Sequence, residues 1–295
     1  MRPPPYPFRS EAARSEYLAF YDARAARWPV PSRTRTVRTR FGETFVRESG
    51  PESGPPLVLL PGMSSSSLMW ETLIAPLAER HRTIAVDSVF DVGRSTPFED
   101  ARSTEDLAQW VDELLAGLAL DRVDLVGMSY GAFIAAHVAL RHPERLRRSV
   151  WLAPAGVAAR LSWRWVSRAL ASGFSRSIHR SFTEWMFADA VGTAEGRRVV
   201  EELIADTQVM IRCCERRPIV TPATMTDAEL AAIRVPSLML VGEHETVCVA
   251  RDAVERVREV APSVRAELVS GAGHDLPIAK REEVLQRVLA FLDET

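Results

Sequence analysis

Short apolar segments alternate with longer amphipathic segments along most of the chain after residue 56. The apolar segments are continuous rather than alternating, which is typical of strands buried on both faces of a parallel sheet. They occupy 57–60, 82–87, 123–128, 149–153, 237–242 and 265–270, and helical spacing is found in 70–80, 103–119, 130–141, 250–260 and 280–293. This order predicts an α/β fold with a mostly parallel, doubly wound sheet.

The first part of the chain has a different pattern. Residues 10–28 carry large apolar side chains at helical spacing and end at "PVP", so we expect a helix within an N-terminal helical arm (1–32). The alternating segment 33–40 and the following "ETFVRE" predict an antiparallel strand pair. The pair opens the first part of the core domain, which we place at 33–156.

A long segment interrupts the strand–helix alternation between two core strands. Residues 157–230 are far longer than an ordinary connection and are rich in tryptophan and phenylalanine. Because ligands bind at the carboxyl edge of such sheets, we expect a helical cap or lid here, with a plain helical layer as the alternative. The second part of the core then spans 231–295.

Composition narrows the class of protein. The chain has 295 residues, 26% of them charged, with a net charge of −2, so no basic surface for nucleic acid is indicated. The N-terminus lacks a signal peptide's apolar core and no apolar run is long enough to span a bilayer, which predicts a cytoplasmic protein without a membrane partner. The three cysteines do not form a disulfide framework or a zinc motif.

The candidate nucleophile lies in "GMSYG", residues 127–131. An apolar strand precedes this motif and an alanine-rich helix follows it, which is the context of a nucleophile elbow. The flanking glycines are expected to allow a sharp turn with Ser129 at its tip. The alternative is a tight turn with an incidental serine.

A serine hydroxyl needs a base, which is most often histidine. Of the six histidines, His274 lies in the glycine-flanked loop "SGAGHD" after the last predicted strand, where the chain can fold over the serine. The acid that orients this histidine is expected between Ser129 and His274 at a strand end. Glu243 and Glu245 both follow the strand 237–242, and alternation puts them on the same side, so the residue pattern leaves both open.

The chain resembles the α/β-hydrolases, and particularly bacterial carboxylesterase-like members. The matching segments are "YDARAARWPVP", "TRFGETFV", "LVLLPGMSSSSLMW", "RTIAVDSVFDVGRS", "LVGMSYG", "LMLVGEHE" and "GAGH". The resemblance implies Glu245 as the acid, although most relatives have aspartate there, and it places one oxyanion donor at the Met63 N–H. Tyr130 N–H, directly after the serine, is the other expected donor. Where relatives usually have His-Gly, this chain has Pro61-Gly62.

The function expected from these residues is hydrolysis of a carboxylic ester through an acyl-enzyme, without a metal or organic cofactor. The aromatic insertion favours a small-molecule substrate with an apolar acyl or alcohol group, and a homodimer is compatible with the sequence. One alternative is a natural-product biosynthetic enzyme that uses the same triad for acyl transfer, cyclisation, thioester cleavage or carboxylate elimination. Another is a ligand-binding relative without turnover.

Overall fold

The computed structural model describes residues 7–294, so residues 1–6 of the expected arm (1–32) and residue 295 lie outside the described residues. The described strands form one nine-stranded sheet in the order β1-β2-β4-β3-β6-β7-β8-β9, with β5 paired to β2. Their bounds are β1 (Ser32–Thr39), β2 (Gly42–Ser49), β3 (Pro56–Leu60), β4 (Arg82–Val86), β5 (Thr96–Pro97), β6 (Val123–Met128), β7 (Leu146–Leu152), β8 (Ser237–Gly242) and β9 (Val264–Val269). From β4 to β9 all neighbouring strands in this order run parallel. The predicted α/β class with a mostly parallel sheet is confirmed.

The antiparallel edge of the sheet is the predicted hairpin. β1 pairs with β2 from Ser32 opposite Ser49 to Thr39 opposite Gly42, and β2 also pairs antiparallel with β4. Gly42 closes the turn with a φ of 151°. A Cβ on this glycine would lie 2.3 Å from the Thr96 carbonyl oxygen, so the turn requires glycine.

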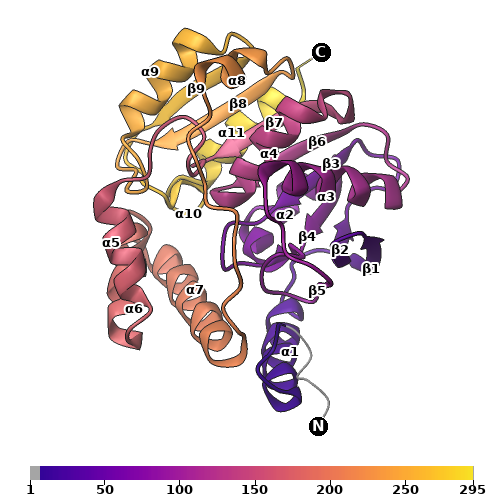
Figure 1. The fold of residues 1–295 in the computed structure, drawn as a ribbon, viewed down its shortest axis with the longest axis vertical. Coiled ribbons are helices and arrows are strands. Elements are labelled where there is room, and N and C mark those ends of the chain that lie inside the picture. Colours follow the sequence, from indigo (N-terminus) through magenta and orange to yellow (C-terminus); the bar gives the residue numbers. More distant parts are fainter. Residues whose placement is uncertain (1–6, 295) are drawn as a thin grey trace.

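Helices cover both faces of the sheet (Figure 1). The α-helices are α1 (Glu11–Ala25), α2 (Ile74–Ala78), α3 (Thr104–Gly117), α4 (Tyr130–Arg141), α5 (Trp163–Ser172), α6 (Arg176–Met186), α7 (Ala194–Cys213), α8 (Asp227–Ala232), α9 (Ala250–Val260), α10 (Leu276–Ala279) and α11 (Arg281–Leu292). The 3-10 helices are η1 (Ser67–Thr72), η2 (Pro143–Arg145) and η3 (Ala190–Gly192). Helices α3, α4, α8 and α9 pack on one face, and η1, α2, α10 and α11 on the other.

Strand β3 explains why the core strands are continuously apolar. Val58 and Leu60 belong to the cluster under α3 and α4, whereas Leu57 and Leu59 belong to the cluster under α2 and α11. All four side chains are fully buried. Since successive side chains of a strand point to opposite faces, a strand covered on both sides must be apolar at every position.

The helix expected at 70–80 differs from the prediction. The chain forms η1 (Ser67–Thr72) and then the separate short helix α2 (Ile74–Ala78). Pro76 has no N–H to donate to the carbonyl of Thr72, so one continuous α-helix cannot run through this segment. The 3-10 helix is capped by Ser66, whose side chain accepts the Leu68 N–H.

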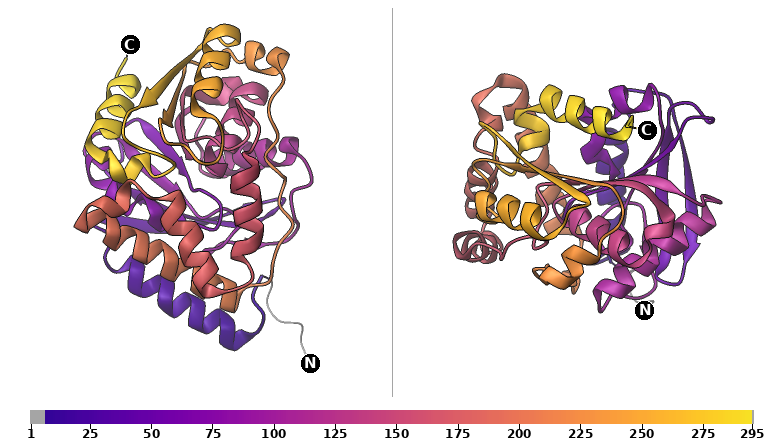
Figure 2. Two further views of the ribbon diagram at one scale, coloured as in Figure 1. Left: turned by 90° about the vertical axis from the view of Figure 1, so that its left-hand side faces the viewer. Right: turned by 90° about the horizontal axis from the view of Figure 1, so that it is seen from above.

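Three long helices lie between β7 and β8, within the segment expected as a cap. Figure 2 shows α5, α6 and α7 grouped at one end of the molecule, with α1 lying alongside α7. The expected end of the segment at 230 falls within α8, which packs against α4 and α9 of the core. The N-terminal helix and the inserted helices thus share one end of the fold, beyond the sheet.

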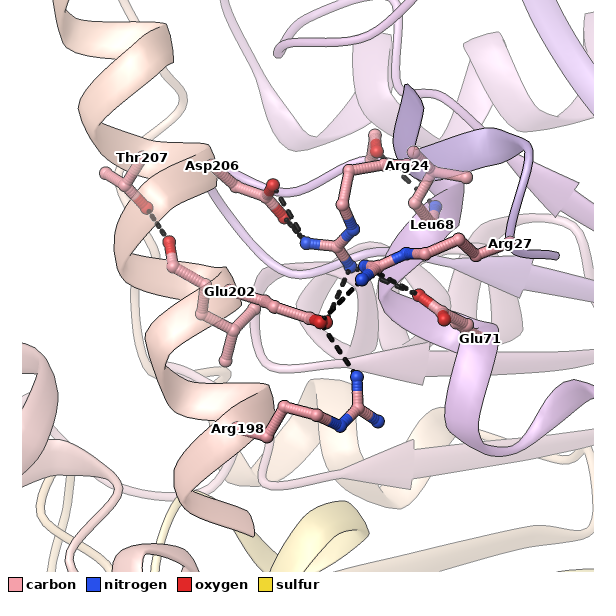
Figure 3. Close-up of polar contacts among 10 residues, drawn as sticks. Arg24, Arg27, Leu68, Glu71, Arg198, Glu202, Asp206 and Thr207 are labelled. Carbon is pink, nitrogen blue, oxygen red and sulfur yellow. Dashed lines mark hydrogen bonds and ion pairs between the residues drawn. The ribbon is translucent and has the colours of Figure 1, made fainter. Parts of the chain in front are cut away.

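A cluster of charged side chains joins α1 to α7 and to η1 (Figure 3). The Arg24 guanidinium forms ion pairs with Glu71 at 3.2 Å, Glu202 at 3.5 Å and Asp206 at 2.9 Å. Arg27 also pairs with Glu202, at 2.9 Å. The Arg24 side chain is only 12% exposed, so these contacts are partly screened from water.

Candidate active site

Ser129 stands between the last residue of β6 and the first residue of α4, with φ 52° and ψ −108°. A left-handed conformation is strained for a residue other than glycine, so neighbouring contacts must hold it. The Ser129 N–H donates to the Leu152 carbonyl at 2.8 Å, and the Ser129 carbonyl accepts the N–H of Phe133 at 3.0 Å. The strand and helix on either side therefore fix the turn.

The glycines of the motif act differently from the expectation. Gly127 and Gly131 do not have positive φ angles, so conformational freedom is not what the turn requires of them. A Cβ on Gly127 would lie 2.2 Å from the Gly131 carbonyl oxygen, and one on Gly131 would lie 2.3 Å from the Leu60 carbonyl oxygen. Glycine is needed for close packing of backbone against backbone, and the sharp turn itself falls on Ser129.

His274 lies in the loop after β9 and points at the serine. Its Nε2 is 3.0 Å from Ser129 Oγ, and its Nδ1 is 3.0 and 3.1 Å from the two carboxylate oxygens of Glu245. A carboxylate only accepts, so the Nδ1–H donates to Glu245 and Nε2 is free to accept the serine proton. The structure thus brings together Ser129, His274 and Glu245 from three loops at the carboxyl edge of the sheet.

Glu245 is held by its own chain segment. Its Oε1 accepts the backbone N–H of Thr246 at 2.8 Å and of Val247 at 2.9 Å, and its side chain is 1% exposed. Glu243, by contrast, is exposed and accepts the Gly271 N–H at 3.3 Å. The longer glutamate fits because it folds back over the following two residues.

The pKa of His274 reflects two opposing effects. Burial by itself would lower it, but the Glu245 carboxylate attracts the protonated ring and accepts its N–H, so the pKa stands above the ordinary 6.5. A histidine in this setting is a stronger base than one in water. The pair can therefore accept a proton from Ser129 and keep the resulting cation stable.

Two residues missed by the sequence reasoning tie the histidine loop to the inserted helices. The Asp275 carboxylate accepts the Ala190 N–H at 2.6 Å and the Gly273 N–H at 3.0 Å. The Phe187 ring meets His274 edge-on, with ring centroids 6.3 Å apart. Asp275 directly follows the histidine in the sequence, but nothing in its neighbourhood indicates a partner 85 residues away.

The two expected oxyanion donors, Tyr130 and Met63, belong to segments that adjoin Ser129. Tyr130 is the first residue of α4, where a backbone N–H has no partner within the helix. Met63 follows Gly62, whose backbone lies against the elbow: a Cβ on Gly62 would be 3.6 Å from the Ser129 Cβ. The Gly62 N–H donates to the Met69 sulfur at 3.1 Å, which fixes the loop that carries Met63.

Within residues 7–294, no group of three or more His, Cys, Asp or Glu side chains is arranged to hold a metal ion. Over the same range, no helix is long and apolar enough to cross a lipid bilayer. The three cysteines, Cys213, Cys214 and Cys248, are buried free thiols.

Comparison with known proteins gives consistent results. The chain is 32% identical to an uncharacterized carboxylesterase, nap, of Bacillus subtilis over 94% of this chain and 92% of that protein. It is 33% identical to the carboxylesterase YbfK of the same organism, over 92% of each chain. The crystal structure of naproxen esterase from Bacillus subtilis superimposes with a TM-score of 0.88 at 32% identity, covering 95% of this chain and 98% of that one.

These findings confirm the expected resemblance to bacterial carboxylesterases. The family model described as the alpha/beta hydrolase family matches residues 57–287, which is well over half of the chain. The fold agrees, with its mostly parallel sheet, its helices on both faces and its serine at a strand-to-helix elbow. The chain belongs to the alpha/beta hydrolase family.

Proposed function

We propose that the protein is a carboxylesterase that works through an acyl-enzyme formed on Ser129. Ser129 Oγ attacks the ester carbonyl while His274 Nε2 takes its proton, and the same proton then passes to the departing alcohol. Water enters, gives a proton to His274 and attacks the acyl group; the bond to Ser129 Oγ then breaks, His274 returns its proton to Oγ, and the acid leaves. Every step uses side chains and backbone of this chain together with water.

The observation that carries this proposal is the contact of 3.0 Å between Ser129 Oγ and His274 Nε2, with Glu245 on the other ring nitrogen. This is the geometry in which a base can remove a hydroxyl proton and an acid can stabilise the cation that forms. The carboxylesterase relatives, which match nearly the full chain, support the reaction class.

The negative charge that develops on the carbonyl oxygen needs donors already in place. We assign this role to the backbone N–H groups of Met63, in the loop after β3, and Tyr130, at the start of α4. Such donors stabilise the transition state more than the substrate and are worth on the order of 10²–10³ in rate each.

The substrate is expected to carry an apolar acyl or alcohol group. A small cavity beside the elbow supports this expectation, because its walls are mainly aromatic and aliphatic. They include Leu60, Gly62, Phe90, Trp110, Tyr130, Ile134 and Ile219, and the polar members are Ser88 and Asp91. The inserted helices α5–α7 fit the role of a cap over this region.

The test is hydrolysis of p-nitrophenyl esters from acetate to decanoate by the wild type and by Ser129→Ala. Turnover that depends on chain length and is lost in the variant is the expected result. Turnover retained by Ser129→Ala would overturn the mechanism. No turnover by a folded wild type that still reacts with a fluorophosphonate at Ser129 would favour the biosynthetic alternative over ester hydrolysis. Cytoplasmic location and a homodimer stay predictions.

A further inference from the structure

The loop after β3 carries Met63, and other parts of the chain must hold this loop still if the Met63 N–H is to bind an oxyanion. Ser64 adopts a φ of 60°, a left-handed conformation that is unfavourable for serine. Something outside the loop must keep Ser64 in this conformation.

Asp91, from the loop after β4, makes that contact. Its Oδ2 accepts the Ser64 N–H at 2.7 Å, and its Oδ1 accepts the Val92 N–H at 2.8 Å. Hydrogen bonds from backbone N–H to an ionised carboxylate are stronger than neutral ones. The carboxylate therefore joins the loop after β3 to the loop after β4.

The consequence reaches Met63, which lies between two anchored residues. On one side the Gly62 N–H donates to the Met69 sulfur at 3.1 Å, and on the other the Ser64 N–H donates to Asp91. With both neighbouring N–H groups engaged elsewhere, the Met63 N–H is the one left to face an oxyanion. We propose that Asp91 is a positioning residue for the oxyanion hole, acting through Ser64 on the Met63 N–H. This inference rests on the proposed function.

The surroundings of Asp91 disfavour its ionised form on balance, but they leave it mostly ionised above pH 6. Burial raises the pKa of this carboxyl to about 6, although the N–H donors of Ser64 and Val92 and the charge of Arg217 act against the rise. Tyr130 and Cys214 also face it, and their own pKa values are raised by burial and by Asp91. A buried carboxylate costs free energy, which its two backbone donors offset.

The test is Asp91→Asn, which keeps the shape but can accept at only one of its two terminal atoms. We expect kcat to fall about 10-fold because a displaced donor weakens transition-state binding, while KM changes by less than kcat, because Asp91 borders the cavity beside the elbow but acts on the rate through the oxyanion hole. The rate of Ser129 labelling by a fluorophosphonate should fall in parallel, since its phosphoryl oxygen occupies the same hole. The matched control is Asp124→Asn, because Asp124 is a buried aspartate of β6 that pairs with Arg147 of β7, and kcat and labelling should be unchanged.

A second substitution separates positioning from general stability. Glycine adopts a positive φ freely, so Ser64→Gly should restore much of the activity lost in Asp91→Asn. If Asp91→Asn does not fold alone, folding of the double variant would show the same coupling, and an unfolded double variant would overturn the proposal. Unchanged kcat and labelling in Asp91→Asn, or a loss that Ser64→Gly does not relieve, would also overturn it.

The outcomes also separate this proposal from the proposed function. Labelling tests Asp91 even if the wild type does not turn over esters. Normal wild-type turnover with no effect of Asp91→Asn overturns only the positioning role. A wild type that neither hydrolyses esters nor accepts the label overturns the proposed function and this inference with it.

Discussion

Gly127 and Gly131 touch across the elbow so closely that a methyl group on Gly127 would lie 2.2 Å from the Gly131 carbonyl oxygen. Both groups belong to backbone in fixed elements, β6 and α4, and neither can move aside as a flexible side chain would. Close backbone packing at the elbow therefore requires glycine at position 127, in addition to the sharp turn at Ser129.

Gly127→Ala should destabilise the protein by about 3 kcal/mol or more, at the upper end of overpacking costs, and should abolish ester hydrolysis. The matched control is Gly192→Ala, because a Cβ there meets nothing within 4 Å and should change stability by less than about 0.5 kcal/mol. Urea unfolding and p-nitrophenyl ester turnover measure both effects. Equal stabilities of the two variants would contradict the packing argument.

Glu245→Gln should lower kcat by on the order of 10³–10⁴-fold, because an amide facing Nδ1 of His274 favours the wrong ring tautomer. Glu243→Gln should leave kcat within about twofold of wild type, since its side chain is exposed, does not touch His274, and a glutamine can still accept the Gly271 N–H. Steady-state kinetics of both variants, with thermal unfolding to check folding, give the comparison. The reverse ranking would assign the acid to Glu243.

The pH dependence of kcat/KM follows from the raised pKa of His274. The base works only when neutral, so activity should increase with pH and reach half of its plateau above 6.5. In Glu245→Gln the attraction for the protonated ring is lost, so the pKa of His274 should fall. The residual kcat/KM should then reach half of its plateau at a lower pH than in the wild type. A midpoint that moves upward in the variant would contradict this assignment of the shift. Initial rates in a constant-ionic-strength buffer series measure it.

Arg24→Met should destabilise the fold by about 3 kcal/mol, because it leaves the partly buried carboxylates of Glu71, Glu202 and Asp206 without their shared cation. Arg198 lies in the same cluster but is 52% exposed and bonds only along its own helix to Glu202, so Arg198→Met should cost less than about 1 kcal/mol. Denaturant midpoints of the two variants provide the measurement. A greater loss of stability in Arg198→Met than in Arg24→Met would contradict the view that Arg24 is the main cation of this cluster.

The sequence predicts the core of this fold well where one physical rule dominates. Strands such as β3 and β8 are buried on both faces and are therefore apolar throughout, which makes them easy to identify. The segment 70–80 was less predictable, because its helical spacing continues across Pro76 while the hydrogen bonds cannot. Helix starts were clearer: Ser10 and Ser103 both cap their helices with a side-chain hydrogen bond.

In the candidate site, the residues that the sequence predicts best are those that lie in short, recognisable motifs. Ser129 and His274 follow from short motifs at the ends of strands. Alternation could not separate Glu243 from Glu245, because the strand ends at Gly242 and the next residues form a turn in which alternation no longer applies. The contacts of Asp91 and Asp275 join segments distant in sequence, and no local pattern records them.

The hydrogen bond from the Ala190 N–H to Asp275 has a consequence for anyone who builds chimeras of this enzyme. Because the donor is main chain, a transplanted segment between β7 and β8 need not conserve the side chain at this position, but it must supply an amide there and cannot carry proline. Glu245 imposes no such demand, since its support comes from its own two following residues. A graft across this boundary could therefore change the substrate range while retaining the acid, provided that the junction keeps one peptide group in register with the histidine loop.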